Sequence, residues 1–467
     1  MSKYFIRHFF KKYNMLKINK ADIFSTIISN ISKIDFQKEC SLDNKLATEK
    51  HQIVTVVETV KREADEAKFG LCVNGNSYYV YNRCFWEIIT YKELSNFLGE
   101  AAQKMGVDKY SGKYFSYQEK LLKQFQSSSE FQRKKNDEVL INLLNCTFVF
   151  NTDSSSFREH KKEDFLKYQL DFEYNPDAKA PLFNKFLDEV LPDKCLQNLL
   201  AEHCGNLFIK SKQLKLEKLP VLYGTGANGK SVFFEIITAL LGKANVSSFS
   251  LQNLTNSNGY YREQIADKIV NYSSELSDKF DNAAFKQLVS GEPIDARSPH
   301  QIPIIIDNYA KMMFNCNSFP KQTEANYAFW RRLHTIGFMV TIDAEKRDPE
   351  LANKIVKSEL AGVFNWVLRG LERLLLNKKF SNCEKADELL ENFRINADSV
   401  SLFIENSGYK KNLENFIYLK DLYEEYTEFC VKNGYYRTTN KTFSDRLKIN
   451  QLKLERKTMG TVVYIKK

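Results

Sequence analysis

The residues with the clearest chemistry lie in one glycine-rich stretch near the middle of the chain. Residues 224–231 fit the pattern Gly-x-x-x-x-Gly-Lys-Ser. In a loop of this kind, backbone N–H groups surround phosphate oxygens, the lysine reaches the β- and γ-phosphates, and the hydroxyl ligates Mg²⁺. We therefore predict that ATP and Mg²⁺ bind here, with Lys230 on the phosphates and Ser231 on the metal. The predicted binding residues are Gly224, Thr225, Gly226, Ala227, Asn228, Gly229, Lys230 and Ser231.

The flanking sequence supplies the elements that such a loop needs. An apolar run, 219–223, precedes it, and a helical pattern, 232–241, follows it. A strand, a loop and a helix in this order direct backbone N–H groups and a helix N-terminus at the phosphates. A chance glycine turn, which is the alternative interpretation, would require neither flank.

Hydrolysis of a bound triphosphate also needs side chains beyond the loop. Glu275 follows a β-prone run, where its carboxylate would hold Mg²⁺ or activate the attacking water. Asn317 follows a second strand-like run, where its amide would orient that water. Arg331 and Arg332 precede a third such run. They are either a solvated face or candidates for an arginine finger that stabilises transition-state charge.

The order of these features resembles a known family. Between Glu275 and Asn317, residues 294–303 read as a hairpin with a polar tip. The chain thus resembles the superfamily 3 helicases, the compact AAA+ motors of small DNA viruses, poxviruses, phages and plasmids. The resemblance lies in the order of the phosphate loop, the acid, the hairpin, the asparagine and the arginine pair. The resemblance is greatest to the helicase half of phage/plasmid and poxvirus-type primase–helicases.

The stretch before the motor resembles the same family. Asn142 and Asn145 stand before a strand, and residues 174–186 follow, as in the domain that precedes the motor in that family. Cys146 replaces the glycine that the family usually has, which puts the local turn geometry in question. The resemblance covers residues 139–467, whereas residues 1–138 suggest no relative.

The resemblance implies a fold and a set of roles. The fold would be α/β, an AAA+ P-loop NTPase core that assembles into a ring, expected to be a hexamer, and moves 3′→5′ on DNA. Lys230 and Ser231 would be the Walker A residues, Glu275 the Walker B acid and Mg²⁺ ligand, and Asn317 sensor 1. Lys311 would lie near the phosphates. One of the two arginines would enter the neighbouring subunit's nucleotide site. The hairpin-tip residues that would contact DNA are Arg297, Ser298 and His300.

The C-terminal sequence has a separate pattern. Residues 419–433 form an amphipathic helical pattern, a Thr-Thr-Asn cap opens a second helix over 441–449, and two strand-like pieces flank Gly460. This order suggests a winged helix, with which the family often ends. Residues 437–467 carry nine Lys/Arg against two acids, which favours duplex DNA as the ligand over a docked protein. The predicted contacts are Lys441, Arg446, Lys448, Arg456 and Lys457.

The N-terminal sequence allows alternative interpretations. Residues 1–20 are basic and aromatic, which fits either a nucleic-acid-binding arm or an ordinary first helix, and residues 21–68 read as helical. From 69 to 90 the pattern turns to β, and Asn74-Gly75 predicts a hairpin. The aromatic residues of that hairpin either stack on bases or, as we expect, pack a small sheet.

Composition restricts the class of protein. The 467 residues carry a formal net charge of +10, which favours a polyanionic partner. Nine singly scattered cysteines with no Cys-x-x-Cys argue against a zinc site or a disulfide framework and for a reducing, cytoplasmic compartment. No apolar run reaches the roughly 18 residues that a membrane span needs. We expect the domains 1–138, 139–215 (pre-motor), 216–345 (motor), 346–400 (helical lid) and 401–467 (winged helix).

These observations lead to one main functional hypothesis and two rivals. The main hypothesis is a ring-forming, ATP-dependent DNA helicase that replicates a virus or mobile element, with single-stranded and duplex DNA as partners and a separate primase as a further one. A combined primase–helicase is disfavoured, because residues 1–138 show no paired carboxylates with a histidine. An origin-binding or loader protein that uses ATP as an assembly switch stays open.

Overall fold

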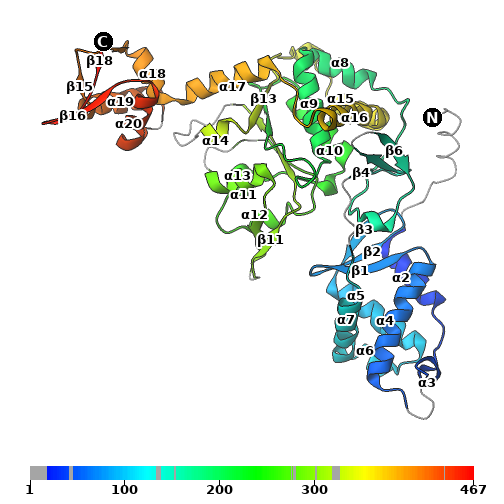
Figure 1. Cartoon of the computed structure of the whole chain (residues 1–467). Coiled ribbons are helices and arrows are strands. Elements are labelled where there is room, and N and C mark those ends of the chain that lie inside the picture. The colour runs from blue at the N-terminus through cyan, green and yellow to red at the C-terminus, as the bar shows by residue number, and fades with distance from the viewer. Residues whose placement is uncertain are drawn as a thin grey trace. The chain divides into compact units, whose positions relative to one another are not determined.

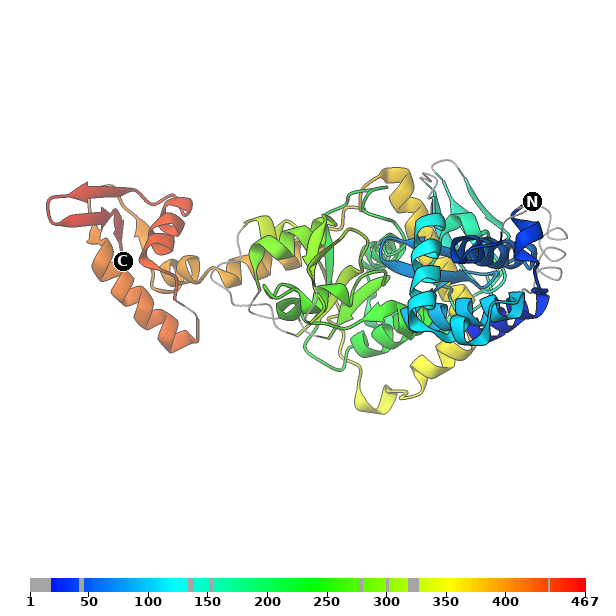
Figure 2. The same ribbon diagram turned by 90° about the horizontal axis from the view of Figure 1, so that it is seen from below.

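The computed structural model describes residues 18–41, 46–132, 138–151, 154–274, 276, 280–299, 302–317, 327–435 and 437–467. It divides into two compact units, Met1–Pro176 and Asp177–Lys467. Figure 1 shows the elements of each unit, and Figure 2 shows them from below. Among the described helices, none has the length and apolar character to cross a membrane.

The first unit begins with a helical layer against a small antiparallel sheet. Its helices are α2 (Lys20–Asn30), α3 (Phe36–Glu39), α4 (Glu49–Glu66), α5 (Tyr91–Met105), α6 (Lys109–Lys113) and α7 (Phe115–Ser128). The sheet has the order β1 (Gly70–Asn74), β2 (Ser77–Tyr81), β3 (Trp86–Ile89). Asn74 pairs with Ser77 across the predicted turn, so the hairpin is confirmed. Tyr79, Tyr81 and Trp86 are buried in one cluster, which confirms that they pack the sheet.

A second antiparallel sheet completes the first unit. It contains β4 (Val139–Asn142), β5 (Thr147–Phe150) and β6 (Ser155–Arg158). The amide of Asn142 donates to the carbonyls of Cys84 (2.9 Å) and Tyr168 (3.0 Å). The amide of Asn145 donates to the Tyr174 carbonyl (3.0 Å) and accepts its N–H (2.8 Å). The two asparagines that carried the resemblance therefore tie distant backbone segments to this sheet.

The core of the second unit is a five-stranded parallel sheet, as expected for an α/β P-loop protein. Its order is β13 (Leu333–Gly337), β7 (Leu219–Tyr223), β12 (Lys311–Cys316), β9 (Val270–Ser273), β8 (Val246–Ser247). The strands are almost wholly buried, as expected where both faces of a parallel sheet are covered. The connecting elements are α10 (Lys230–Leu241), α11 (Leu251–Leu254), α12 (Tyr260–Glu263), α13 (Asn282–Ser290), α14 (Tyr327–Trp330) and the antiparallel hairpin β10 (Ile294–Ala296) and β11 (Ile304–Ile306).

Five helices flank the sheet region along the chain, two before its first strand and three after its last strand. They are α8 (Pro181–Val190), α9 (Lys194–Asn206), α15 (Leu351–Ser358), α16 (Leu360–Asn377) and α17 (Glu384–Ala397). Within the region expected to form a helical lid, the structure separates α15 from α16 at Glu359. The Glu359 carboxylate accepts the N–H groups of Leu182 and Phe183, both at 3.0 Å. The helix is interrupted where this buried carboxylate caps the N-terminus of α8.

Two cysteines form a disulfide, although the scattered cysteine positions argued against a disulfide framework. Cys195 in α9 is bonded to Cys383, just before α17, with a Cα–Cα distance of 5.5 Å. The two residues are 188 positions apart, so spacing could not indicate the pair. The other seven cysteines, all in described parts of the chain, form no disulfide, so there is no wider framework among them.

The C-terminal residues form a small α/β module, shown in orange and red in Figures 1 and 2. Its helices are α18 (Ser399–Asn406), α19 (Leu419–Asn433) and α20 (Asn440–Ile449). Its strands are β14 (Lys410–Lys411), β15 (Ile417–Tyr418), β16 (Leu454–Lys457), β17 (Gly460–Val463) and β18 (Ile465–Lys466), in the orders β15-β17-β16 and β14-β18. Both predicted helices are confirmed, and Thr439 caps the second by accepting the Thr442 N–H (3.2 Å).

Candidate functional site

The predicted phosphate-binding loop, here called the phosphate loop, connects β7 to α10, the position that the sequence indicated. Three of its residues have left-handed backbone conformations, Gly226 (φ 123°), Ala227 (φ 51°) and Gly229 (φ 84°). Such conformations turn successive backbone N–H groups toward one side and form an anion-binding concavity. Lys230 begins α10, so the positive end of the helix dipole faces the same side.

Close packing makes two of the glycines necessary. A Cβ atom on Gly224 would lie 2.5 Å from the Phe338 carbonyl oxygen, and one on Gly229 would lie 2.8 Å from Val190 in α8. The loop is also anchored by hydrogen bonds. The Ile342 N–H donates to Ala227 (2.8 Å), and the Asn228 amide donates to the Phe338 carbonyl (3.0 Å).

Lys230 is a buried cation inside this loop, with 6% of its surface exposed. Its ammonium donates to the Gly224 carbonyl (2.5 Å) and to Asn228 Oδ1 (3.0 Å). Burial lowers its pKa below the usual lysine value. Among the described residues the ammonium has neutral acceptors only, and phosphate oxygens would provide the negative charge that these acceptors lack. These features fit a nucleoside triphosphate, which would supply the γ-phosphoryl group for transfer to water. The predicted Mg²⁺ ligand Ser231 is exposed on the first turn of α10.

The strand register brings further predicted residues to the same edge of the sheet. Cys316 at the end of β12 pairs with Tyr223 at the end of β7, and its carbonyl accepts the Gly224 N–H (3.0 Å). Asn317, which directly follows, therefore lies beside the phosphate loop and is exposed. The register of β9 with β12 ends at Ser273, so its carboxyl end meets the same edge. Glu275, the predicted Walker B acid, lies outside the described residues.

One buried hydrogen bond at this edge was not anticipated. The Tyr272 hydroxyl donates to Asn315 Oδ1 (3.0 Å) in the interior between β9 and β12. Tyr272 is fully buried. The bond fixes the strand that leads to Asn317 against the strand that leads to position 275. Its signal in the sequence is weak, a tyrosine and an asparagine within two strand-like runs.

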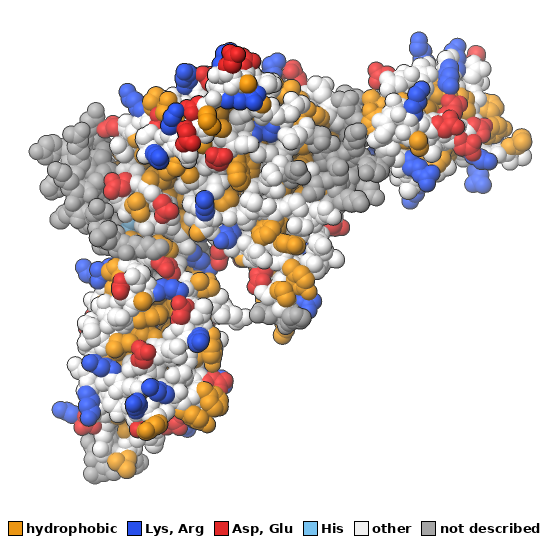
Figure 3. Space-filling model, turned by 180° about the vertical axis from the view of Figure 1, so that it is seen from behind, with side chains coloured by type: hydrophobic (Ala, Val, Ile, Leu, Met, Phe, Trp, Pro, Cys, Tyr) orange, Lys and Arg blue, Asp and Glu red, His pale blue; other side chains and the backbone are white. Residues whose placement is uncertain are grey.

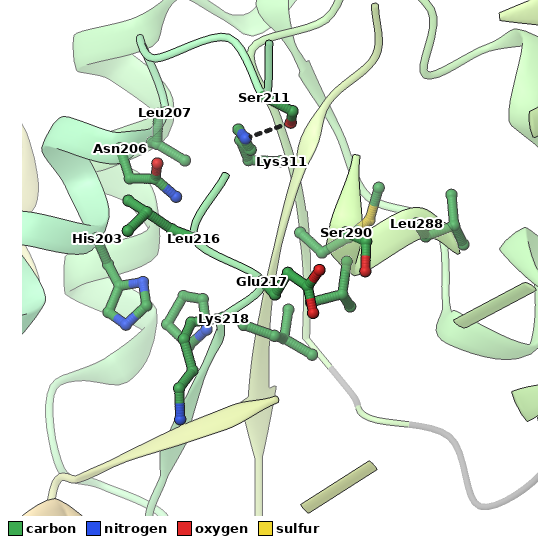
Figure 4. A pocket seen from close by; sticks show the side chains of 14 residues that line it. His203, Asn206, Leu207, Ser211, Leu216, Glu217, Lys218, Leu288, Ser290 and Lys311 are labelled. Atoms are coloured by element: carbon green, nitrogen blue, oxygen red, sulfur yellow. Dashed lines mark hydrogen bonds between the residues drawn. The ribbon is translucent and has the colours of Figure 1, made fainter. Parts of the chain in front are cut away.

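The structure does not bring Lys311, Arg331 and Arg332 to the phosphate loop of the same chain. Lys311 begins β12, and the two arginines directly precede β13, so all three lie at the amino edge of the parallel sheet. The expectation that Lys311 approaches the phosphates is therefore not supported within one chain. Its ammonium donates to Ser211 Oγ (2.8 Å), and burial lowers its pKa to about 8 (Figure 4).

The two arginines have different surroundings. The Arg332 side chain is 8% exposed and donates to Glu217 (3.2 Å) and to Ser290 Oγ (3.5 Å). The Arg331 side chain is 50% exposed and lies 3.9 Å from the same carboxylate. Burial would raise the pKa of Glu217, but Lys215 and the arginines hold it below the usual value. Arg332 is thus part of the packed structure, whereas Arg331 is available to another molecule.

Figure 4 shows a small pocket at this amino edge. Its lining includes His203, Asn206, Glu217, Lys218 and Lys311, and its volume is about 20 Å³. That volume is close to the room needed by a single water molecule, so the pocket is too small for a nucleotide. It also lies at the opposite edge of the sheet from the phosphate loop. Among the described residues, no group of three or more His, Cys, Asp or Glu side chains is arranged to hold a metal ion.

The predicted hairpin is present as β10 and β11. Arg297 and Ser298 follow β10, and the Ser298 hydroxyl donates to the carboxylate of Glu263. His300 lies outside the described residues. The second arm carries an unexpected apolar surface, since Ile302, Ile304 and Ile305 are 86%, 44% and 69% exposed. Figure 3 shows hydrophobic side chains gathered on this projection.

The predicted DNA contacts of the C-terminal module divide into two sets. Lys441 and Arg456 are exposed, and Lys448 is exposed beside Asp445 (3.2 Å). Arg446 is only 15% exposed and is paired with Asp398 (3.2 Å). Its placement therefore does not support a DNA contact, because the guanidinium joins α20 to the N-terminus of α18.

An aromatic and basic sheet face in this module was missed by sequence reasoning. Lys457 Nζ lies 3.8 Å from the centre of the Phe416 ring, and Lys453 Nζ lies 4.7 Å from that of Tyr464. The strand register places Tyr418 on the same face, opposite Val462. The sequence carried a signal for this face. Phe416 and Tyr418 are two residues apart and Lys453 and Lys457 are four apart, and even spacing in a strand places side chains on one face.

Comparison with known proteins finds two matching families and viral relatives. Residues 64–192 match the D5 N terminal like family, and residues 222–332 match DUF5906, a family of unknown function. The chain is 26% identical over 203 residues to a protein of Acanthamoeba polyphaga mimivirus and 25% identical over 259 residues to one of Invertebrate iridescent virus 6, both named "Putative helicase". These alignments cover 41% and 47% of this chain but 21% and 26% of those proteins. The chain thus spans about a quarter or less of the length of these relatives.

Solved structures give a weaker likeness. The apo C-terminal region of NrS-1 is 12% identical with a TM-score of 0.49, covering 86% of this chain and 97% of that one. The first family match begins at residue 64, inside the stretch for which the sequence had suggested no relative. The two family matches and the viral relatives confirm the resemblance that the motifs indicated, to the helicase half of phage/plasmid and poxvirus-type primase–helicases.

Proposed function

We propose that the chain is the ATP-hydrolysing motor of a DNA helicase that replicates a virus, phage or mobile element. The observation that carries the proposal is the carboxyl edge of the parallel sheet. There the phosphate loop, with its buried Lys230, lies directly beside the exposed Asn317. Viral relatives named as helicases support the choice of DNA unwinding among the many uses of such a site.

Each residue at this edge would take one part in hydrolysis. Lys230 would neutralise the β- and γ-phosphate oxygens, and Ser231 would hold Mg²⁺ together with Glu275. Asn317 would orient the attacking water. Glu275 is also the residue to which the sequence assigns activation of that water. The order of strands supports this division, because β12 lies between β7 and β9 and presents Asn317 between their ends.

We propose further that the active site is completed by a neighbouring copy of the chain, in a ring that we expect to be a hexamer. Arg331 is half exposed at the edge of the sheet opposite the phosphate loop, where it would enter the next subunit's site as an arginine finger. The exposed isoleucines of the β10–β11 hairpin also support assembly, since an apolar surface of this kind is typical of a protein interface.

For DNA contact we propose two elements. The tip of the β10–β11 hairpin, with Arg297, Ser298 and His300, would grip a single strand. The C-terminal module, interpreted as a winged helix, would contact duplex DNA through Lys441, Lys448, Arg456 and Lys457. Translocation is expected to run 3′→5′. A primase activity is not part of the proposal.

The alternative is an ATP-switched origin-binding or loader protein that does not unwind. The two proposals are separated by measuring ATPase rate with and without single-stranded DNA, and strand displacement from a forked duplex. We expect stimulation by DNA and unwinding, both lost in Lys230→Ala and retained in Lys243→Ala, which changes an exposed lysine beyond α10. ATP-dependent assembly on DNA without strand displacement would instead favour the loader, and ATPase activity indifferent to DNA would refute both.

A further inference from the structure

The first unit displays a cluster of aromatic side chains that its core does not use. Residues 109–115 read Lys-Tyr-Ser-Gly-Lys-Tyr-Phe. Tyr110, Tyr114 and Phe115 are 81%, 58% and 70% exposed. Large aromatic side chains are normally at least half buried in a folded domain. Together with Lys109 and Lys113 they form what we call the α6 aromatic patch.

The backbone beneath the patch is held tightly. A Cβ atom on Gly112 would lie 2.6 Å from the Gln103 side chain and 3.2 Å from the Gly99 carbonyl oxygen, so α6 packs directly on α5. The Gln118 amide donates to the Gly112 carbonyl (3.1 Å) and accepts the Ser95 hydroxyl (3.1 Å). The aromatic side chains therefore project from a rigid platform, which reduces the entropy that binding would cost.

The charge of the patch is positive. Lys109 and Lys113 repeat at a spacing of four residues, are exposed, and form no ion pair with any residue that the structure describes. The adjacent acid, Asp108, is occupied as the N-cap of α6. Its carboxylate accepts the N–H groups of Ser111 (2.9 Å) and Tyr110 (3.0 Å), and these bonds lower its pKa.

We propose that the α6 aromatic patch binds single-stranded DNA. Every base offers a face that can stack on an exposed ring, and the lysines would pair with the phosphates between the stacked bases. A protein partner is less well matched, because this surface pairs open rings with two uncompensated cations and offers no deep apolar pocket. The choice of DNA as the nucleic acid rests on the proposed function. The patch would give the motor a hold on the strand that is independent of its ATP site.

The test uses the full chain and a fluorescein-labelled oligothymidylate, with binding followed by anisotropy. Tyr110→Leu, Tyr114→Leu and Phe115→Leu keep an apolar side chain but remove the ring, and each should weaken binding about tenfold. Lys109→Gln combined with Lys113→Gln should reduce the slope of log K against log salt by about 1.4. Tyr91→Leu, an exposed tyrosine at the far end of α5, is the matched control and should bind like the wild type.

The outcomes separate this inference from the proposed function. If DNA stimulates the ATPase of the wild type but the patch variants bind the oligonucleotide normally, the inference is overturned and the proposed function is not. Equal losses on single-stranded and duplex DNA would overturn the assignment to single strands. A wild type that neither binds the oligonucleotide nor responds to it in ATPase assays would overturn both. Losses confined to single-stranded DNA, with unchanged basal ATPase, would establish the site.

Discussion

Arg331 and Arg332 provide the most discriminating test of the proposed shared active site. The sequence offers two adjacent arginines, but the structure gives them different surroundings. Arg332 is packed beneath the surface against Glu217 and Ser290, and Arg331 is half exposed. We predict that Arg331→Ala abolishes hydrolysis without affecting folding. Arg332→Ala should instead reduce stability and affect hydrolysis only through the loss of folded protein.

The expected magnitudes follow from burial. The Arg331–Glu217 contact is long and exposed, so its loss should cost less than about 0.5 kcal/mol of unfolding free energy. Breaking a buried ion pair costs about 3–5 kcal/mol. Glu217 is 34% exposed and keeps Lys215 at 3.2 Å, so we discount the Arg332 value to about 2 kcal/mol. An arginine finger contributes about 10³-fold or more to the rate of phosphoryl transfer, so Arg331→Ala should lower kcat by at least that order.

The assay combines thermal unfolding with ATPase rates on each variant alone and mixed with Lys230→Ala. In the mixture, Arg331→Ala supplies an intact phosphate loop and its neighbour supplies the finger. About a quarter of the interfaces in a randomly mixed ring should then be active. An Arg331→Ala protein with wild-type turnover would refute the assignment. So would an Arg332→Ala protein that is fully stable but inactive, or a mixture that recovers nothing.

Two further predictions concern a glycine of the phosphate loop and a buried pair of histidines. Gly229→Ala should destabilise the chain by about 2–3 kcal/mol and abolish nucleotide binding, because the new methyl group meets Val190 and the left-handed backbone is strained. Gly75→Ala, with similar φ but open space, should cost only about 1 kcal/mol, and equal melting shifts would contradict the packing argument. The buried His203–His334 pair (2.9 Å) should make the fold acid-sensitive, because burial lowers the pKa of both rings, that of His334 to about 3. Stability should be complete above about pH 6.5, the unfolded pKa. It should fall by about 2 kcal/mol for each ring by pH 5 and continue to decline toward the folded pKa. Denaturant titrations should show that the unfolding free energy of His334→Gln falls less steeply below pH 6.5 than that of the wild type. An equal pH dependence in the two proteins would exclude the pair as the cause.

Features determined by neighbouring residues were predictable from the sequence. The position of the phosphate loop between its strand and helix was predictable because the glycine positions and the apolar flanks are local signals. The helix at 419–433 has the expected bounds because an apolar periodicity ends at Gly434, whose φ of 71° terminates it. The Asn74-Gly75 turn forms for the same kind of reason. Each of these depends on interactions within a few residues along the chain.

Features that depend on distant residues were not predictable. The interruption at Glu359 comes from a cap on α8, 176 positions earlier in the sequence. The Cys195–Cys383 bond and the Arg446–Asp398 pair likewise join separate segments. The position of Lys311 shows the same limit. The family resemblance implied a position close to the phosphates, but the parallel register shows that the first residue of β12 lies at the opposite edge from the loop.

The register of β13 with β7 supplies the strongest argument that the active site is shared between subunits. The five residues of β13 separate Arg331 and Arg332 from the level of the phosphate loop, because Leu333 pairs with Leu219 and Gly337 pairs with Tyr223. At roughly 3.3 Å per residue the two edges are about 16 Å apart, which exceeds the reach of an arginine side chain. Arg331 therefore cannot stabilise charge on a nucleotide held by its own loop. If it is a finger, it must act on a second copy of the chain. Loss of activity in Arg331→Ala would then be direct evidence for assembly as well as for catalysis.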